Sequence, residues 1–170
     1  YIIVNFIFSI MPFMGLKIIQ IMKYFAYGSN LNISDLKKWC ERRNEEMPIL
    51  KNPKITKINN FMIGFTRKSI SRAGGVADLV LSKGDFCYGV TFDATENDFE
   101  ILDKKEGVNE DGTGAYERLE LTNEIITYQV RIKNENFIQP SEKYLDVIIE
   151  GAKYHKLPNE WIKKLETFRN

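Results

Sequence analysis

Two spacings of apolar residues alternate along most of the chain, and they predict strands interleaved with helices. Apolar positions that alternate with polar ones are typical of strands, whereas positions three or four apart are typical of helices. The strand patterns cover residues 23–26, 61–65, 76–81, 88–92, 119–121 and 126–130. The helical patterns begin at Asn32 or Ser34, at Thr95, at Ser141 and at Pro158. This order predicts one domain of mixed helices and strands over residues 22–170.

Residues 1–21 differ from this domain, because 15 of them are apolar and Lys17 is their one charged residue. Polar residues and Pro12 interrupt the run, whereas a membrane-spanning helix needs about 20 continuous apolar residues. The segment also lacks the basic start and the small-residue cleavage site of a secretory signal. We therefore expect residues 1–21 to be an apolar N-terminal extension outside the native domain, with Met22 as the biological start.

The composition narrows the classes of function. The chain has 170 residues, and its 24 Lys and Arg against 23 Asp and Glu give a net charge of +1. Nucleic-acid-binding domains usually carry a basic excess, so we expect no nucleic-acid partner, and we expect no membrane partner either. The single histidine, His155, excludes metal sites built from two or more histidines. In an enzyme without a cofactor, proton transfer would then fall to a carboxylate.

The two cysteines, Cys40 and Cys87, lie far apart in the sequence and form no CxxC motif. They could form one disulfide at most, and a domain of this size has enough core to fold without one. We therefore expect a reducing compartment, the cytoplasm.

The first candidate site consists of Tyr27, Gly28, Ser29 and Asn30, between the first predicted strand and the first predicted helix. Gly28 would allow a positive φ and the close approach of a ligand to the backbone. The N–H groups that follow, with the positive end of the helix, would suit a carboxylate or an oxyanion. A plain tight turn with an asparagine cap is the alternative.

The second candidate is Glu106, which lies in the last turn of a predicted helix just before Gly107. The free carbonyl groups at a helix C-terminus disfavour a nearby negative charge. Such a place suits a general base that must also release its proton. A solvated glutamate beside Lys104 and Lys105 is the alternative, and position alone does not separate the two.

Together, in this order and spacing, the two candidates resemble the γ-glutamylcyclotransferase family. The resemblance covers nearly all of residues 22–170. The motifs that carry it are Phe25-Ala26-Tyr27-Gly28-Ser29-Asn30-Leu31, Gly74-Gly75-Val76-Ala77-Asp78, Leu102-Asp103-x-x-Glu106-Gly107, Tyr116, Pro140-Ser141-x-x-Tyr144 and Gly151-Ala152-Lys153-x-x-x-Leu157-Pro158.

The resemblance implies an α+β fold in which helices flank a small, barrel-like mixed sheet. It also implies a lyase reaction without cofactor or metal: the α-amine of a γ-glutamyl amide attacks the γ-carbonyl group and releases 5-oxoproline and an amine or amino acid. Glu106 would be the catalytic acid and base. The substrate-binding residues would be Tyr27, Gly28, Ser29, Asn30, Leu31 and Tyr116. The resemblance leaves open whether the protein forms a homodimer.

Two departures from the family pattern concern the leaving group. Residues 108–115 make a longer linker than the family's, and residues 132–136 lack a tyrosine that some relatives have. The leaving group could be an amino acid, an ε-lysyl amine or another amine, and the pattern is closer to the general branch than to relatives specific for glutathione. Two other hypotheses stay open: a non-catalytic module that binds a small carboxylate ligand, and a hydrolase that uses Cys87 and His155.

Overall fold

The computed structural model describes residues 20–109, 111–122 and 124–169. The N-terminal extension expected at residues 1–21 lies outside these residues, except for its last two positions. The elements follow in the order β1 (Met22–Ala26), η1 (Ser29–Leu31, a 3-10 helix), α1 (Ile33–Arg43), β2 (Lys51–Ser69), β3 (Gly74–Ala94), α2 (Glu96–Glu106), β4 (Tyr116–Thr122), β5 (Ile125–Val130), α3 (Glu142–Tyr154) and α4 (Asn159–Glu166).

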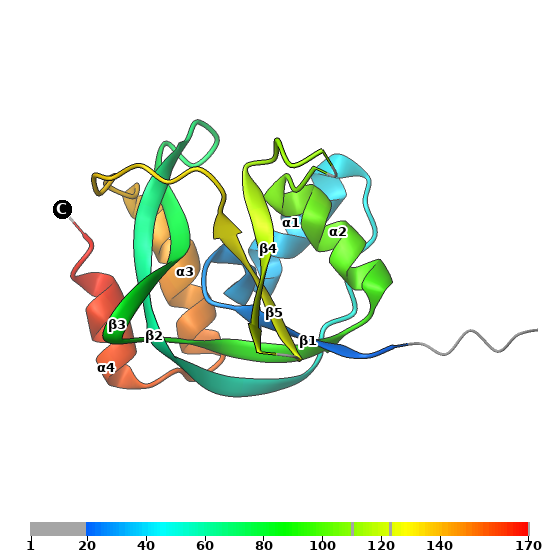
Figure 1. Ribbon diagram of the computed structural model, residues 1–170, viewed down its shortest axis with the longest axis horizontal. Coiled ribbons are helices and arrows are strands. Elements are labelled where there is room, and N and C mark those ends of the chain that lie inside the picture. The colour runs from blue at the N-terminus through cyan, green and yellow to red at the C-terminus, as the bar shows by residue number, and fades with distance from the viewer. Residues whose placement is uncertain (1–19, 110, 123, 170) are drawn as a thin grey trace, which may run out of the picture.

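The strands form one mixed five-stranded sheet in the order β2-β3-β1-β5-β4. The short strand β1 lies at its centre, antiparallel to β3 and parallel to β5. In Figure 1, α3 and α4 lie toward the long β2–β3 hairpin, and α1 and α2 lie toward β4. The predicted mixed order of helices and strands is therefore confirmed.

The sheet is open, with β2 and β4 at its edges, but side-chain bonds draw its two halves together. The carboxylate of Asp78, on the first half of β3, accepts from the backbone N–H of Val130 on β5 at 2.8 Å. The same carboxylate accepts from Nζ of Lys133 at 2.7 Å. The hydroxyl of Tyr116, on β4, donates to the carbonyl oxygen of Ala77 at 3.0 Å. These bonds join β3 to β4, β5 and the segment after β5, while the backbone ladder of the sheet stays open.

The hairpin of β2 and β3 is longer than the sequence pattern predicts. Residues 51–60 form the first half of β2, although their side chains are mostly exposed and show no apolar alternation. Asn52 and Asn60 have φ values of 50° and 63°, and the register with β3 shifts beside each of them. Bulges of this kind break the period of two by which a strand is recognised. The two separate strands predicted at 76–81 and 88–92 are, for the same reason, parts of the single strand β3.

The core lies between the sheet and the helices, and aromatic and leucine side chains fill it. Phe25 of β1 and Phe99 of α2 are fully buried, and Trp161 of α4 packs against the rings of Phe86 and Tyr88 on β3. These contacts fix α2 and α4 to the sheet. None of the helices in the described part of the chain is long and apolar enough to span a membrane.

Candidate active site

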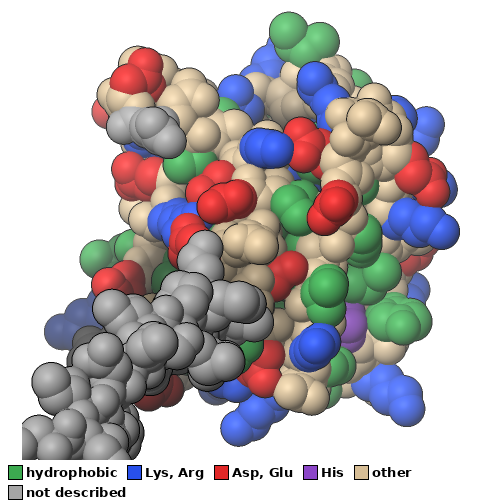
Figure 2. All heavy atoms as spheres, turned by 90° about the vertical axis from the view of Figure 1, so that its right-hand side faces the viewer, with side chains coloured by type: hydrophobic (Ala, Val, Ile, Leu, Met, Phe, Trp, Pro, Cys, Tyr) green, Lys and Arg blue, Asp and Glu red, His purple; other side chains and the backbone are tan. Residues whose placement is uncertain are grey.

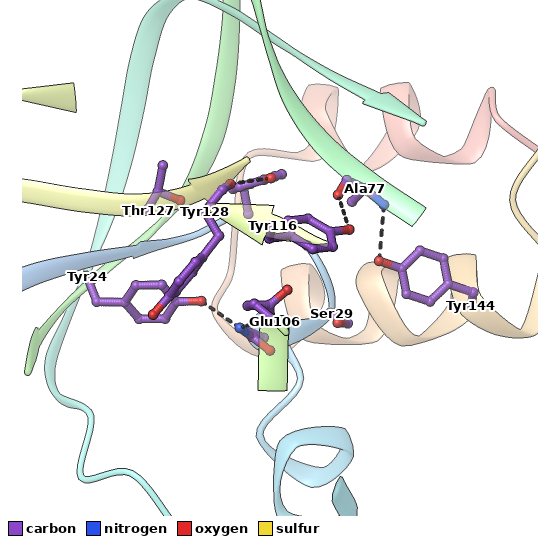
Figure 3. A pocket seen from close by; sticks show the side chains of 11 residues that line it. Tyr24, Ser29, Ala77, Glu106, Tyr116, Thr127, Tyr128 and Tyr144 are labelled. Atoms are coloured by element: carbon purple, nitrogen blue, oxygen red, sulfur yellow. Dashed lines mark hydrogen bonds between the residues drawn. The ribbon is translucent and has the colours of Figure 1, made fainter. Parts of the chain in front are cut away.

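A small pocket opens where β1, the loop after it, β3, α2, β4, β5 and α3 meet. Its empty space, including the part open to solvent, is about 310 Å³. Figure 3 shows its lining, in which Glu106 and Ser29 face a group of tyrosine rings. The lining residues are Tyr24, Tyr27, Gly28, Ser29, Asn30, Ala77, Glu106, Tyr116, Thr127, Tyr128 and Tyr144.

Capping residues fix both ends of α2, the helix that carries Glu106 at the pocket. Thr95 and Asp98 form a capping box at the start of the helix, where each side chain accepts from the other's backbone N–H. Gly107 ends the helix at φ 64°, a left-handed conformation that glycine adopts at little cost. Glu106 is therefore the last residue of the helix, at the point where the chain turns away.

The carboxylate of Glu106 is held on one of its two oxygens. Nδ2 of Asn30 donates to Oε1 of Glu106 at 2.9 Å, and Nζ of Lys105 lies 3.6 Å from the same oxygen. Of the described residues that line the pocket, only Glu106 carries a carboxylate. Glu106 is thus the one carboxylate of this lining that could serve as a general acid or base.

Asn30 is buried and links Glu106 to the sheet. Its Nδ2 also donates to the hydroxyl of Tyr24 at 2.7 Å. Its Oδ1 has no hydrogen-bond partner within the described part of the chain. An unpaired buried acceptor is costly, so this oxygen is available to a donor group on a ligand.

The tyrosines of the pocket are neutral hydrogen-bonding groups. Figure 3 shows Tyr116 and Tyr144 meeting Ala77, where Tyr116 donates to the carbonyl oxygen and Tyr144 accepts from the N–H at 3.2 Å. Burial, with a smaller contribution from the charge of Glu106, raises the pKa of Tyr144 to about 12. Burial first, and then neighbours that include Glu106, raises the pKa of Tyr116 well above its ordinary value. Both hydroxyls therefore stay protonated at neutral pH.

The loop after β1 differs in one respect from the sequence prediction. The φ of Gly28 is −108°, so the expected positive φ is wrong. The need for glycine is steric instead, because a Cβ at this position would lie 3.1 Å from the Cβ of Ala77. Ser29 and Asn30 then open the short helix η1, whose first N–H groups have no partner within the helix.

The structure brings together Tyr27, Gly28, Ser29, Asn30, Glu106 and Tyr116 at the pocket. Leu31, the remaining predicted site residue, does not line it. Its side chain is fully buried, and its backbone packs against Gly151 of α3, where a Cβ would lie 2.6 Å from the Leu31 carbonyl carbon. Leu31 therefore belongs to the core.

Five lining residues were not predicted to be part of the site: Tyr24, Ala77, Thr127, Tyr128 and Tyr144. Tyr24, Tyr128 and Tyr144 follow strand and helix spacings in the sequence, which predict that their side chains belong to the core. Ala77 and Tyr144 stand in motifs that carry the family resemblance. For the tyrosines, a hydroxyl on an otherwise apolar face was a further signal, because buried tyrosines usually need a hydrogen-bond partner.

The alternative pair, Cys87 and His155, shares no contact in the described part of the chain. Cys87 is fully buried, and burial raises the pKa of its thiol. His155 packs edge-on against Phe92 in an apolar groove, and burial lowers its pKa. Figure 2 shows hydrophobic side chains around this histidine. A thiol and an imidazole that both stay neutral do not make a thiolate–imidazolium pair.

Known proteins resemble this chain along most of its length. A sequence model of the AIG2-like family matches residues 87–165. Gamma-glutamylcyclotransferase of Bos taurus is 32% identical over 154 residues, which cover 85% of this chain and 77% of the bovine protein. The protein of the same name from Mus musculus is 30% identical over 153 residues, covering 84% of this chain and 76% of that one.

The fold agrees with these similarities in sequence. A solved structure named gamma-glutamyl cyclotransferase superposes with a TM-score of 0.68 at 27% identity, and the match covers 88% of this chain and 89% of that one. The expected fold class, a mixed sheet with flanking helices, is thereby confirmed. On sequence and fold together, the chain belongs to the gamma-glutamylcyclotransferase family.

Proposed function

We propose that this protein cleaves γ-glutamyl amides by an internal cyclisation. The nitrogen of the α-amine attacks the γ-carbonyl carbon and forms the ring bond of 5-oxoproline. The bond from that carbon to the amide nitrogen then breaks, and an amine or amino acid leaves. The observation that carries the proposal is the position of Glu106, whose carboxylate lies in a small pocket beside the loop of residues 27–30.

Glu106 would move the proton that the reaction has to relocate. An α-amine has a pKa of about 8, so at neutral pH it is mostly protonated and cannot attack. The Glu106 carboxylate would take this proton and deliver it to the departing nitrogen, so the carboxylate returns to its starting state. Lys105 and Asn30 hold one oxygen of the carboxylate, which leaves the other to face the substrate.

The loop and its neighbours would hold the glutamyl unit. The N–H groups of Ser29 and Asn30 could stabilise the negative charge that develops on the γ-carbonyl oxygen during attack. Oδ1 of Asn30 could accept from the substrate amine, since it has no partner among the described residues. Tyr27 and Tyr116 would shape the pocket, with the hydroxyl of Tyr27 fixed on the carbonyl of Tyr128 at 2.7 Å.

Much of the rate enhancement would come from the folded shape of the bound substrate. Reactions between two well-oriented groups of one molecule reach effective concentrations of about 10⁵–10⁸ M. A small pocket with fixed tyrosines suits this task, because it would keep the amine close to the carbonyl. The names of the bovine and mouse relatives support the same reaction class.

A panel of γ-glutamyl compounds tests the proposal: γ-glutamyl-alanine, glutathione, Nε-γ-glutamyl-lysine and a γ-glutamyl alkylamine. We expect 5-oxoproline from at least one of them, measured by mass spectrometry, with an equal amount of released amine. If the protein binds these compounds without turnover, the pocket belongs to a binding module and the proposal is wrong.

A further inference from the structure

Lys105 differs from the other lysines near the pocket in how little of it is exposed. Its side chain is 6% exposed, whereas that of its neighbour Lys104 is 58% exposed and pairs with Glu45. Burial of an ammonium group is costly unless nearby groups compensate. A lysine in solvent needs no such compensation, whereas the buried Lys105 must have neighbours that compensate its charge.

The ammonium group of Lys105 lies next to two residues that line the pocket, Ser29 and Glu106. Its Nζ is 3.5 Å from Oγ of Ser29 and 3.6 Å from Oε1 of Glu106. It also lies close enough to Asp35 on α1 to help lower the pKa of that carboxyl, although burial and the bond to Arg72 affect Asp35 more. One ammonium group thus joins the end of α2 to the loop of the candidate site.

Lys105 and Asn30 approach the same oxygen of Glu106. The neutral amide of Asn30 donates to Oε1 at 2.9 Å, and the ammonium group of Lys105 is the second partner of that atom. In the described part of the chain, no hydrogen bond reaches Oε2. The two carboxylate oxygens therefore have different surroundings, one anchored and one open.

We propose that Lys105 is a positioning residue that anchors Oε1 of Glu106 together with Asn30, so that Oε2 exchanges the proton with the substrate. This inference rests on the function proposed above. The proton passes from the substrate's α-ammonium nitrogen to Oε2 and from Oε2 to the leaving nitrogen. Lys105 itself neither gains nor loses a proton, and it does not line the pocket.

Other groups that act on Glu106 come from several elements, and all but one are neutral tyrosines. They are Tyr24, Tyr27, Tyr116, Tyr144 and the cation Arg72. Arg72 is bound to Asp35 through two hydrogen bonds of 2.9 and 2.6 Å, which offset its charge. Lys105 is thus the cation that lies directly against the Glu106 carboxylate, 3.6 Å from Oε1.

The test compares Lys105→Gln with Lys104→Gln, which makes the same charge change one residue earlier, outside the pocket. For Lys105→Gln we expect kcat to fall about tenfold through loss of orientation and KM to change less than about threefold. Lys104→Gln should match the parent, and Lys105→Arg should recover part of the loss.

A second readout does not depend on activity. The ¹³C resonance of the Glu106 carboxyl group, assigned by its absence in Glu106→Gln, should lie at a different chemical shift in Lys105→Gln than in the parent at the same pH, because the ammonium group beside Oε1 is lost. If Lys105→Gln unfolds, Lys105→Met keeps the aliphatic stem and serves instead. An unchanged carboxyl resonance, or a rise in KM alone, would overturn the positioning role. A parent protein that forms no 5-oxoproline would overturn the proposed function, while the carboxyl resonance would still show whether Lys105 positions the Glu106 carboxylate.

Discussion

Glu106 differs from the other carboxylates of its helix in where its side chain lies. Glu100 is exposed, and Asp103 is occupied by Arg118 and Tyr128. Glu106 alone of these three lines the pocket. The sequence pattern placed all three on one helix, but the contacts of each side chain depend on strands that are distant in sequence.

The substitution Glu106→Gln should remove the base while preserving the shape of the side chain. We expect kcat to fall by about 10²–10⁴-fold, the usual loss when a general acid–base group is removed. Substrate affinity should change little, because in the proposed mechanism the loop of residues 27–30 would provide most of the binding contacts. Steady-state rates of 5-oxoproline release provide the measurement.

Glu100→Gln is the matched control, since it makes the same chemical change on the exposed face of the same helix. It should behave as the parent protein does. If Glu106→Gln also keeps the parent rate, another group moves the proton and the assignment of Glu106 is wrong.

The space around Gly28 limits the size of the side chain that can replace it. A Cβ would lie 3.1 Å from the Cβ of Ala77, so Gly28→Ala requires a small shift, and the two methyl groups added by Gly28→Val have still less room. We expect kcat/KM to fall modestly in the alanine variant and to be lost in the valine variant, while circular dichroism shows both folded. Equal activity in a folded valine variant would mean that substrate does not approach this loop.

At the scale of elements, a cluster of charges fixes α2 to the sheet. Nε and Nη2 of Arg118, on β4, donate to the two oxygens of Asp103 at 2.9 and 2.6 Å. Tyr128, on β5, donates to Asp103 at 2.7 Å. This cluster holds the helix that carries Glu106, and its own side chains apart from Tyr128 stay out of the pocket.

Asp103→Asn should therefore lower stability more than activity. Weakening two charged hydrogen bonds should reduce the free energy of unfolding by about 1–3 kcal/mol. Chemical denaturation measures this loss, and kcat/KM at a temperature where the variant is folded should stay within about threefold of the parent value. A loss of kcat as large as that of Glu106→Gln, without loss of stability, would give Asp103 the catalytic role.

The elements with local end signals are the ones that the sequence predicted best. Thr95 caps the start of α2 with its side chain, and the left-handed Gly107 ends the helix. The side chains of Asn32 and Ser141 likewise cap the starts of α1 and α3. The first half of β2 has no such signal, because its exposed polar side chains and two bulges remove the alternation. Its strand character comes from pairing with β3, which is a tertiary contact.

At the scale of the whole molecule, the pocket exists only because seven parts of the chain converge. The sequence predicted six lining residues, five of them in two motifs, because those motifs are local and resemble a known family. It could not place Tyr24, Tyr128 and Tyr144 there, since their presence depends on the strand order β3-β1-β5 and on the packing of α3. Leu31 was assigned to the site by its place beside the motif, and the packing of η1 on α3 placed it in the core.

The domain boundary is a prediction at this scale. The first strand begins at Met22, and its pairing with β3 runs from Met22 to Ala26. We therefore expect a chain that begins at Met22 to keep the thermal midpoint and the kcat/KM of the longer chain. A clear fall in the thermal midpoint, measured by differential scanning calorimetry, would mean that residues 1–21 belong to the domain.

The central claim is that the substrate's own amine, and not water, attacks the γ-carbonyl group. Turnover of an active γ-glutamyl substrate in H₂¹⁸O, followed by mass spectrometry of the products, tests this most directly. Internal attack predicts 5-oxoproline without ¹⁸O, in an amount equal to the released amine, and no glutamate. Glutamate that carries ¹⁸O in its γ-carboxyl group would show attack by water and would contradict the mechanism.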